Sequence, residues 1–342
     1  MICLGVECTA HTFGIGIAKD NEIIANARDV YVPVKGGIHP IEAKEHHDKV
    51  KDIVLENALK TANLSLDNID VFAYSAGPGL PPCLKIGSEF IRNIAKQKPV
   101  IAVNHCVAHI EIGKLMTQCK DPITLYVSGG NTQIIGYAAE KYRVFGETQD
   151  IGIGNAIDKF IRETVGGFPG GPILDKIAQE SNKNYIELPY VVKGMDLSFS
   201  GILTSAIQKF KKNKEILPDL CYSFQETCYA MLTEVTERAL AHTQKNEVLL
   251  TGGVAASARL QEMLRIMCDE RKQIDAQSAS ADAKFFVCPR EFAGDNGAMI
   301  AYTGLLAYKH GEKNAQFDFK QRWRTDDVSI NWVKCQTPDN SR

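Results

Sequence analysis

The sequence predicts an α/β fold made of two similar halves, and three observations support this. Residues 2–28 are typical of an apolar strand followed by a two-stranded hairpin, and residues 124–148 repeat the layout about 120 residues later. In each half a later strand runs into a glycine turn, at 68–79 and at 246–255. Helical patterns flank both of these strands. Such halves form open sheets that bind ligands at the strand ends, here in a cleft between two lobes.

The individual elements follow from the spacing of the apolar residues. Alternating or short continuous apolar runs predict strands, and apolar residues three and four apart predict helices. In the first half we expect strands at 2–9, 11–18, 22–28, 68–75 and 99–103, and helices at 46–62, 85–96 and from 105 onward. In the second half we expect strands at 124–132, 133–138, 142–148 and 246–251, and helices at 217–244, 256–270 and 298–308.

Breaks in these patterns predict the lobe boundaries. A proline, Pro122, follows a helical pattern and marks the division between lobes at 1–120 and 121–325. Residues 150–215 are rich in glycine and proline and are interpreted as an insertion in the second lobe. A polar, peripheral tail is expected at 326–342.

Composition excludes several classes of protein. Lys plus Arg is 39 and Asp plus Glu is 41, a net charge of −2, which is unlike a protein that holds nucleic acid unaided. The ten cysteines include no C-x-x-C pair, which argues against a four-cysteine zinc site. Because neither a signal peptide nor an apolar run of about 18 residues is present, we expect a cytoplasmic protein with reduced thiols and no membrane contact.

Two glycine turns are candidates for binding phosphate. Residues 128–132 read Ser-Gly-Gly-Asn-Thr after a strand, where glycine lets backbone N–H groups approach an anion. Residues 252–254 form a second turn that opens a helix. A single turn of this kind is more often a tight connection, but two at equivalent places favour a phosphorylated ligand. The chain has no G-x-x-x-x-G-K-[ST] segment and no G-x-G-x-x-G after its first strand.

His105 and His109 form the first candidate metal site. At i and i+4 on a helix, both imidazoles lie on one face and could chelate an ion. The pair is not a zinc-protease motif, because Cys106 stands where H-E-x-x-H needs glutamate. The plainer alternative is a pair of partly buried histidines that bond to backbone or carboxylate groups.

Two other places offer ligand chemistry. His46 and His47 are adjacent, point about 100° apart on a helix and are interpreted as residues of a helix face. Asp295 precedes an apolar helical pattern, so it is either an N-cap or a metal ligand.

Seven motifs together resemble a known family. They are Val6 to Thr12, Lys35 to Pro40, His46-His47, Ala76 to Leu80, Asn104 to His109, Tyr126 to Thr132 and Gly294 to Gly297. The chain resembles, from Met1 to about Trp332, the archaeal and eukaryotic branch of the TsaD family. These proteins are tRNA threonylcarbamoyladenosine transferases and the catalytic subunit of the KEOPS complex. The resemblance implies the actin-like ATPase (ASKHA) fold, in agreement with the duplication.

The resemblance also implies ligand sites. It implies one iron ion held by His105, His109, Asp295 and Tyr126, with zinc as the less specific fit. The residues implied to hold threonylcarbamoyl-AMP are Tyr126, Val127, Ser128, Gly129, Gly130, Asp158, Gly171, Asp175 and Ser257. Ser257 stands where the family commonly has asparagine, and a hydroxyl cannot replace both the donor and the acceptor of the amide. ATP is a further candidate ligand.

The implied activity is transfer of threonylcarbamoyl from its AMP anhydride to the N6 amine of the adenosine 3′ of the tRNA anticodon, at position 37. It needs no side-chain nucleophile, and Asp158, Asp175 and a water molecule at the metal are open candidates for accepting the amine proton. Two alternatives are a small-molecule carbamoyltransferase and a sugar- or acetate-type kinase on the same fold. A metalloprotease is disfavoured by the missing general base, and a non-enzymatic scaffold is a further alternative.

The implied partners are tRNA, a small atypical kinase/ATPase, a dimerising subunit and a tRNA-binding subunit. Lys35, Lys85 and Arg92 are candidates for local contacts to tRNA. Given the net charge of −2, most of the affinity for tRNA is expected to come from the partner subunits.

Overall fold

The computed structural model describes residues 1–33, 37–274, 283–312 and 315–333. They form two compact units, each with its own core. The first contains Met1–Leu115, Tyr137–Arg143 and the described residues from Asp295 onward, and the second contains Met116–Gly136 and Val144–Gly294. Lys35, one of the predicted tRNA contacts, lies outside the described residues, as do residues 334–342 of the predicted tail.

The first unit is built on a mixed five-stranded sheet. Its strands are β1 (Ile2–Glu7), β2 (Thr12–Lys19), β3 (Glu22–Val30), β4 (Val71–Gly77) and β5 (Val100–Asn104). The spatial order is β3-β2-β1-β4-β5, in which β1, β2 and β3 are antiparallel and β4 and β5 run parallel to β1. The predicted meander over residues 2–28 is therefore confirmed.

The second sheet repeats this topology. Its strands are β6 (Ile123–Val127), β7 (Thr132–Ala138), β8 (Lys141–Glu147), β11 (Glu247–Thr251) and β12 (Lys284–Val287). The order β12-β11-β6-β7-β8 is the first sheet's order read from the other edge, again with two parallel strands beside the first strand of a meander. The shared order confirms the predicted duplication.

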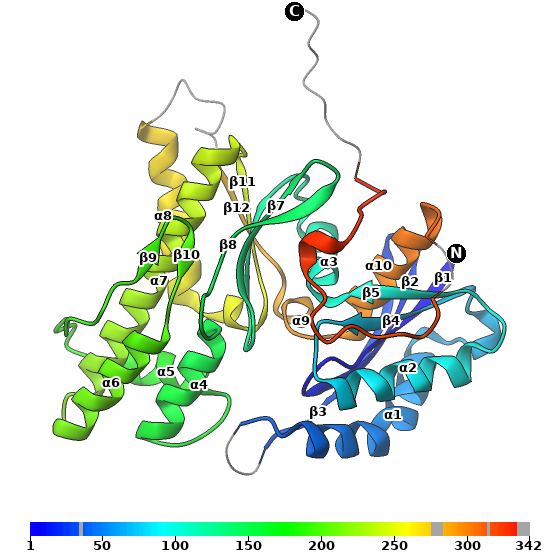
Figure 1. Ribbon diagram of the computed structural model, residues 1–342, viewed down its shortest axis with the longest axis horizontal. Coiled ribbons are helices and arrows are strands. Elements are labelled where there is room, and N and C mark those ends of the chain that lie inside the picture. The colour runs from blue at the N-terminus through cyan, green and yellow to red at the C-terminus, as the bar shows by residue number, and fades with distance from the viewer. Residues whose placement is uncertain (34–36, 275–282, 313–314, 334–342) are drawn as a thin grey trace, which may run out of the picture. The chain divides into compact units, whose positions relative to one another are not determined.

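Helices cover both faces of the first sheet (Figure 1). Along β1, Leu4 and Val6 point to one face, where they join a core with α1 (Pro40–Ala62) and α2 (Pro81–Ala95). Gly5 points to the opposite face, against α10 (Gly297–Lys309). α3 (His105–Thr117) follows β5 directly, and a short 3₁₀ helix, η1 (Leu66–Asn68), precedes β4.

α10 packs on the first unit, although the sequence-based division placed its residues within 121–325. The contact is close because glycines line it: a Cβ on Gly5 would lie 2.1 Å from the backbone nitrogen of Ala301, and one on Gly16 would lie 2.1 Å from that of Ala298. α10, near the end of the sequence, is therefore packed against strands β1 and β2 from its beginning. Sequence order gives no sign of this return.

Gly16→Ala is expected to lower the free energy of unfolding by about 3 kcal/mol, because the new methyl group overlaps backbone that cannot move without shifting α10. The measurement is urea unfolding followed by circular dichroism. Gly201→Ala is the matched control, since its Cβ would meet nothing within 4 Å, and it should change stability by less than about 1 kcal/mol. Equal stability of the two variants would contradict the close packing.

The second unit holds its sheet against α7 (Leu217–Thr243) and α8 (Ala258–Ile274). Residues 150–215, interpreted from their glycines and prolines as an insertion, contain α4 (Ile153–Thr164), α5 (Gly170–Gln179) and α6 (Ser200–Lys212), with a hairpin of β9 (Val192–Lys193) and β10 (Asp196–Leu197). They are well packed. Ile153, Ile157 and Phe160 recur at helical spacing and are fully or almost fully buried in the unit's core.

Asp150 holds the start of α6. Its carboxylate accepts hydrogen bonds from the backbone N–H groups of Phe199 (2.9 Å) and Ser200 (3.0 Å). Burial alone would raise the pKa of Asp150, but these bonds, with those from the Ser200 hydroxyl and the Ile151 N–H, outweigh it and lower the pKa to about 2. The carboxylate therefore stabilises the fold above its ordinary pKa of about 4, and this contribution is lost as the pH falls toward 2.

Asp150→Asn is expected to lower the free energy of unfolding by about 1 kcal/mol at pH 7, the usual effect of losing a helix cap. The difference from the wild type should shrink as the pH is lowered from about 4 to about 2. Urea unfolding at several pH values measures it. A difference that stays constant over that range would contradict the role of the charged form.

The described end of the chain packs on the first unit. Ile330 is buried, and the indole N–H of Trp332 donates to the carboxylate of Glu111 in α3 at 2.8 Å. This part of the expected peripheral tail is therefore attached, and its first two residues belong to η3 (Thr325–Asp327). None of the helices in the described ranges combines the length and apolar character needed to cross a membrane.

Candidate metal and nucleotide sites

α3 presents the two predicted histidines from its first two turns. The side-chain oxygen of Asn104 accepts the backbone N–H groups of Cys106 (3.0 Å) and Val107 (3.1 Å), which caps the helix immediately before His105. His105 and His109 then lie one turn apart with ring centroids separated by 4.7 Å. The predicted i, i+4 geometry is confirmed.

Asp295 joins the histidines from the far end of the sequence. Its Oδ1 lies 3.5 Å from Nε2 of His105 and 3.3 Å from Nε2 of His109, and the three ligand atoms lie within 4.8 Å of one another. Arg28 donates to the Asp295 carbonyl at 3.2 Å. The N-cap interpretation of Asp295 is wrong, because the cap of α10 is Asn296, whose side chain accepts the N–H of Met299 at 3.0 Å.

The three groups strongly affect one another's protonation. Burial lowers the pKa of His105, but the neighbouring carboxylates of Glu7 and Asp295 outweigh this and raise it to about 9. Burial lowers the pKa of His109. Burial would raise the pKa of Asp295, yet the adjacent histidines, His105 above all, lower it well below its usual value. A carboxylate held between two imidazoles in this way is a ready ligand set.

The other predicted metal residues are placed differently. His47 is fully buried and its Nε2 lies 2.9 Å from the Ala10 carbonyl oxygen, while His46 lies 2.8 Å from Asp29. Neither belongs to a cluster of three ligands within the part of the chain that the structure describes, which agrees with their interpretation as helix residues. Tyr126 is fully buried in the second unit, and its role as a further ligand stays a prediction.

The second unit places the two glycine turns beside each other. β6 and β11 are parallel neighbours with Tyr126 opposite Thr251, so both turns leave the sheet at the same edge. A Cβ on Gly252 would lie 2.2 Å from the carbonyl oxygen of Val127, and its φ of +97° also requires glycine. The second turn opens a 3₁₀ helix, η2 (Gly253–Ala256), before α8, rather than a helix directly.

The first turn is held by α4. The carbonyl oxygens of Ser128 and Gly129 accept the N–H groups of Gly154 and Asn155, both at 3.1 Å. The first amides of α4 are therefore used to hold the turn. Gly129 and Gly130 are exposed, and a Cβ on Gly130 would meet nothing within 4 Å. Their open backbone can be approached by a ligand.

The remaining predicted donor-site residues lie on elements that contact this turn. α4 contacts α5 and η2. Asp158 of α4 accepts the N–H of Gly170 at 2.7 Å, which places it beside Gly171 at the start of α5. Asp175 of α5 accepts hydrogen bonds from Gln225 (2.5 Å) and from the Ser257 hydroxyl (3.3 Å). Burial raises the pKa of Asp175 despite these bonds.

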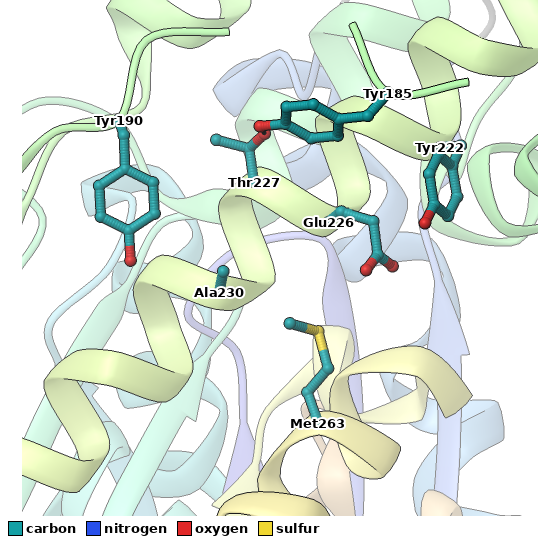
Figure 2. A pocket seen from close by; sticks show the side chains of 7 residues that line it. All are labelled: Tyr185, Tyr190, Tyr222, Glu226, Thr227, Ala230 and Met263. Carbon is teal, nitrogen blue, oxygen red and sulfur yellow. Dashed lines mark hydrogen bonds between the residues drawn. The ribbon is translucent and has the colours of Figure 1, made fainter. Parts of the chain in front are cut away.

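A cavity of about 230 Å³ lies near this cluster, between α7, α8 and the segment that carries Tyr185 and Tyr190 (Figure 2). Tyr222, Glu226 and Met263 line it from the helices. Glu226 follows Gln225, the partner of Asp175, along α7. No predicted site residue lines this cavity.

The two described candidates for tRNA contact are already engaged within the first unit. The Arg92 guanidinium lies 4.8 Å from the ring centre of Phe317, and Lys85 lies 3.7 Å from Glu89 on α2. Both side chains are exposed, so a further contact is sterically open.

Comparison with known proteins assigns the family. The family model described as "TsaD: tRNA N6-adenosine threonylcarbamoyltransferase" matches residues 21–302. The chain belongs to the TsaD family. The tRNA N6-adenosine threonylcarbamoyltransferase of Thermococcus kodakarensis is 53% identical over 336 residues, which are 97% of this chain and 100% of that protein. Membership of the TsaD family makes the chain an enzyme of the transferase class.

Longer relatives and solved structures extend this result. A probable bifunctional tRNA threonylcarbamoyladenosine biosynthesis protein of Methanocaldococcus jannaschii is 49% identical over 98% of this chain and 61% of its own length. HypF of T. kodakarensis superposes with a TM-score of 0.55 at 14% identity, covering 91% of this chain and 48% of that one. The ROK hexokinase of Thermus thermophilus gives 0.50 at 15% identity, covering 91% and 100%. These structures show the fold alone, and it is the actin-like ATPase fold expected of a TsaD protein.

Glu7 was not singled out as a functional residue from the sequence. It ends β1 and is fully buried, with Oε2 3.0 Å from Nδ1 of His105. His11 was also missed, and its Nδ1 lies 3.8 Å from Asp295. A charged residue that ends an apolar strand was the available signal for Glu7.

Proposed function

We propose that the chain transfers the threonylcarbamoyl group from threonylcarbamoyl-AMP to the N6 amine of the adenosine at position 37 of tRNA. The single observation that carries the proposal is the convergence of His105, His109 and Asp295 in a chain of the TsaD family. Two histidines of α3 and a carboxylate 186 residues further along the chain form one cluster, whereas the plainer interpretation has an isolated histidine pair.

The proposed metal is iron, with zinc as the less specific fit. The residues suit an ion of this kind, because two imidazole nitrogens face one carboxylate oxygen and all three groups are largely buried. His105, His109 and Asp295 would hold it, with Tyr126 proposed as a further ligand. When bound, the ion would supply Lewis acidity toward the threonylcarbamoyl group.

The donor is proposed to bind in the second unit. The exposed backbone of Gly129 and Gly130 can donate to the phosphate of the adenylate. Tyr126, Val127, Ser128, Asp158 and Gly171 are proposed to complete the site. Asp175 and Ser257 are proposed to hold the nucleoside part, where Ser257 offers one hydroxyl in place of the usual amide. ATP is a further candidate ligand of this site.

The proposed step is a direct attack by the amine. The N6 lone pair forms a bond to the carbamoyl carbon, the bond from this carbon to the phosphate oxygen breaks, and AMP leaves with that electron pair. N6 loses a proton, for which Asp158 and Asp175 are the candidate side-chain acceptors. No thiol is needed, and the described cysteines suit this because all are buried. Burial raises the pKa of Cys83 and Cys221 to about 12, which leaves them protonated and weakly nucleophilic.

The acceptor distinguishes this function from the alternatives. The chain is incubated with threonylcarbamoyl-AMP, the partner subunits and either tRNA or a mixture of small amines and sugars, and AMP release is followed. We expect AMP release to depend on tRNA. Release that depends on a small molecule would favour a small-molecule carbamoyltransferase, and phosphate transfer from ATP to a sugar or acetate would favour a kinase.

The proposed partners are tRNA, a small atypical kinase/ATPase, a dimerising subunit and a tRNA-binding subunit. Support comes from relatives named for tRNA threonylcarbamoyladenosine biosynthesis and from the net charge of −2. A chain with so little excess positive charge needs help to hold a polyanion.

A further inference from the structure

Glu7 lies directly behind His105, on the side away from Asp295. The carboxylate is fully buried at the end of β1. Oε1 accepts the backbone N–H of Thr9 at 2.8 Å and the Thr9 hydroxyl at 2.5 Å, and Oε2 lies 3.0 Å from Nδ1 of His105. The carboxylate is thus surrounded by donors, and Nδ1 of His105 is the ring nitrogen that it contacts.

This arrangement determines how the His105 ring is used. A carboxylate only accepts hydrogen bonds, so Nδ1 must carry the proton that it donates to Oε2. In the neutral ring that binds an ion, the lone pair is then on Nε2, and Nε2 is the nitrogen that lies 3.5 Å from Asp295. Thr9 fixes the carboxylate through Oε1 and so fixes the direction in which Oε2 points.

We infer that Glu7 is a positioning residue that holds His105 in the tautomer and orientation in which Nε2 binds the metal. The inference rests on the proposed metal site. Partners of this kind, a carboxylate behind a ligating histidine, typically change metal affinity ten- to a hundredfold.

Glu7→Gln is the discriminating variant because it has the same shape. Its amide has one oxygen to accept and one NH₂ to donate. The Thr9 N–H must keep an acceptor, so the amide oxygen turns toward Thr9 and the NH₂ faces Nδ1 of His105. Nδ1 then faces a donor where it faced an acceptor. Either the ring proton moves to Nε2 and blocks the ligand atom, or the ring turns so that Nδ1 donates to the Thr9 hydroxyl oxygen, 3.3 Å away, which changes the direction of Nε2.

Zn²⁺ affinity is measured by competition with a chelator, and the His105 ring nitrogens are observed by ¹⁵N NMR in the Zn²⁺-loaded protein. The wild type should show a protonated Nδ1, and Glu7→Gln should bind Zn²⁺ ten- to a hundredfold more weakly. The matched control is Glu111→Gln, a second buried carboxylate of the same unit, which bonds to Tyr142 and Trp332 and should keep wild-type affinity.

Wild-type affinity in Glu7→Gln, or a proton on Nε2 of His105 in the loaded wild type, would overturn the role of Glu7 while leaving the metal site intact. Absence of Zn²⁺ binding by the wild type would overturn the metal site and this role together. The affinity measurement uses no tRNA and no threonylcarbamoyl donor, so its result does not depend on whether the chain catalyses the proposed transfer.

Discussion

Replacement of His105 by alanine is expected to lower the rate of threonylcarbamoyl transfer by on the order of 10³-fold. The imidazole is one of the three side chains that converge at the proposed metal site in the described part of the chain, and without it His109 and Asp295 would not hold an ion that would supply several kcal/mol of charge stabilisation. The modified nucleoside is measured by mass spectrometry after digestion of tRNA under single-turnover conditions, and bound metal is measured in the same preparation.

His310→Ala is the matched control for this variant. His310 lies at the exposed end of α10 in the same unit, where its Nδ1 contacts only the carbonyl oxygen of Leu306 among the interactions described. It should retain both metal and rate. Undiminished turnover by His105→Ala would remove the metal assignment.

Gly129→Leu is expected to weaken donor binding by on the order of 10²-fold while leaving the fold intact. The Cβ would meet only Asn155 Oδ1, at 3.4 Å, which is an ordinary contact. The rest of the leucine would cover the exposed backbone that is proposed to donate to phosphate, and losing two hydrogen bonds to a charged group costs about 3 kcal/mol. Calorimetry with AMP or a stable analogue of the adenylate measures the change.

Gly201→Leu controls for the addition of a leucine to an exposed glycine. Position 201 lies near the start of α6 and its Cβ would meet nothing within 4 Å. Donor binding should be unaffected there, and both variants should unfold near the wild-type temperature. Normal AMP affinity in Gly129→Leu would show that the turn is a tight connection only.

The pattern of the sequence predicted all five strands of the first sheet and four of the five in the second, where β12 (Lys284–Val287) was missed. β1 is buried on both faces, with Leu4 and Val6 toward one core and Gly5 toward a helix, and its short continuous apolar run predicts the strand before any partner is known. The repeated meander, strand and helix units then led to the duplication. The local pattern of apolar residues predicts strands because each strand buries its own apolar side chains.

Other parts of the fold could not be predicted as directly. The glycines and prolines near residues 166–172 drew attention to turns, yet Ile153, Ile157 and Phe160 carried a helical pattern that was available and not used. The return of α10 to the first sheet depends on Gly5 and Gly16, whose role is visible only when the partner backbone is in place. Sequence distance hides such contacts.

In the proposed metal site too, local spacing predicted some residues, and contacts between distant parts of the chain were not predicted. The spacing of His105 and His109 predicted one helix face, because i and i+4 are fixed by helix geometry. Asp295 lies 186 residues beyond His109, and only family resemblance could suggest that it joins them. Glu7 was missed, because its burial behind His105 results from tertiary packing.

The most direct test of the account follows the threonylcarbamoyl carbon itself. Threonylcarbamoyl-AMP labelled with ¹³C at the carbamoyl carbon is incubated with the metal-loaded chain, its partner subunits and tRNA, and the digested nucleosides are analysed by mass spectrometry. The account predicts labelled N6-threonylcarbamoyladenosine and AMP in equal amounts, and no labelled nucleoside from a tRNA that carries guanosine at position 37. Label in a small molecule, or in a nucleoside other than that adenosine, would contradict it.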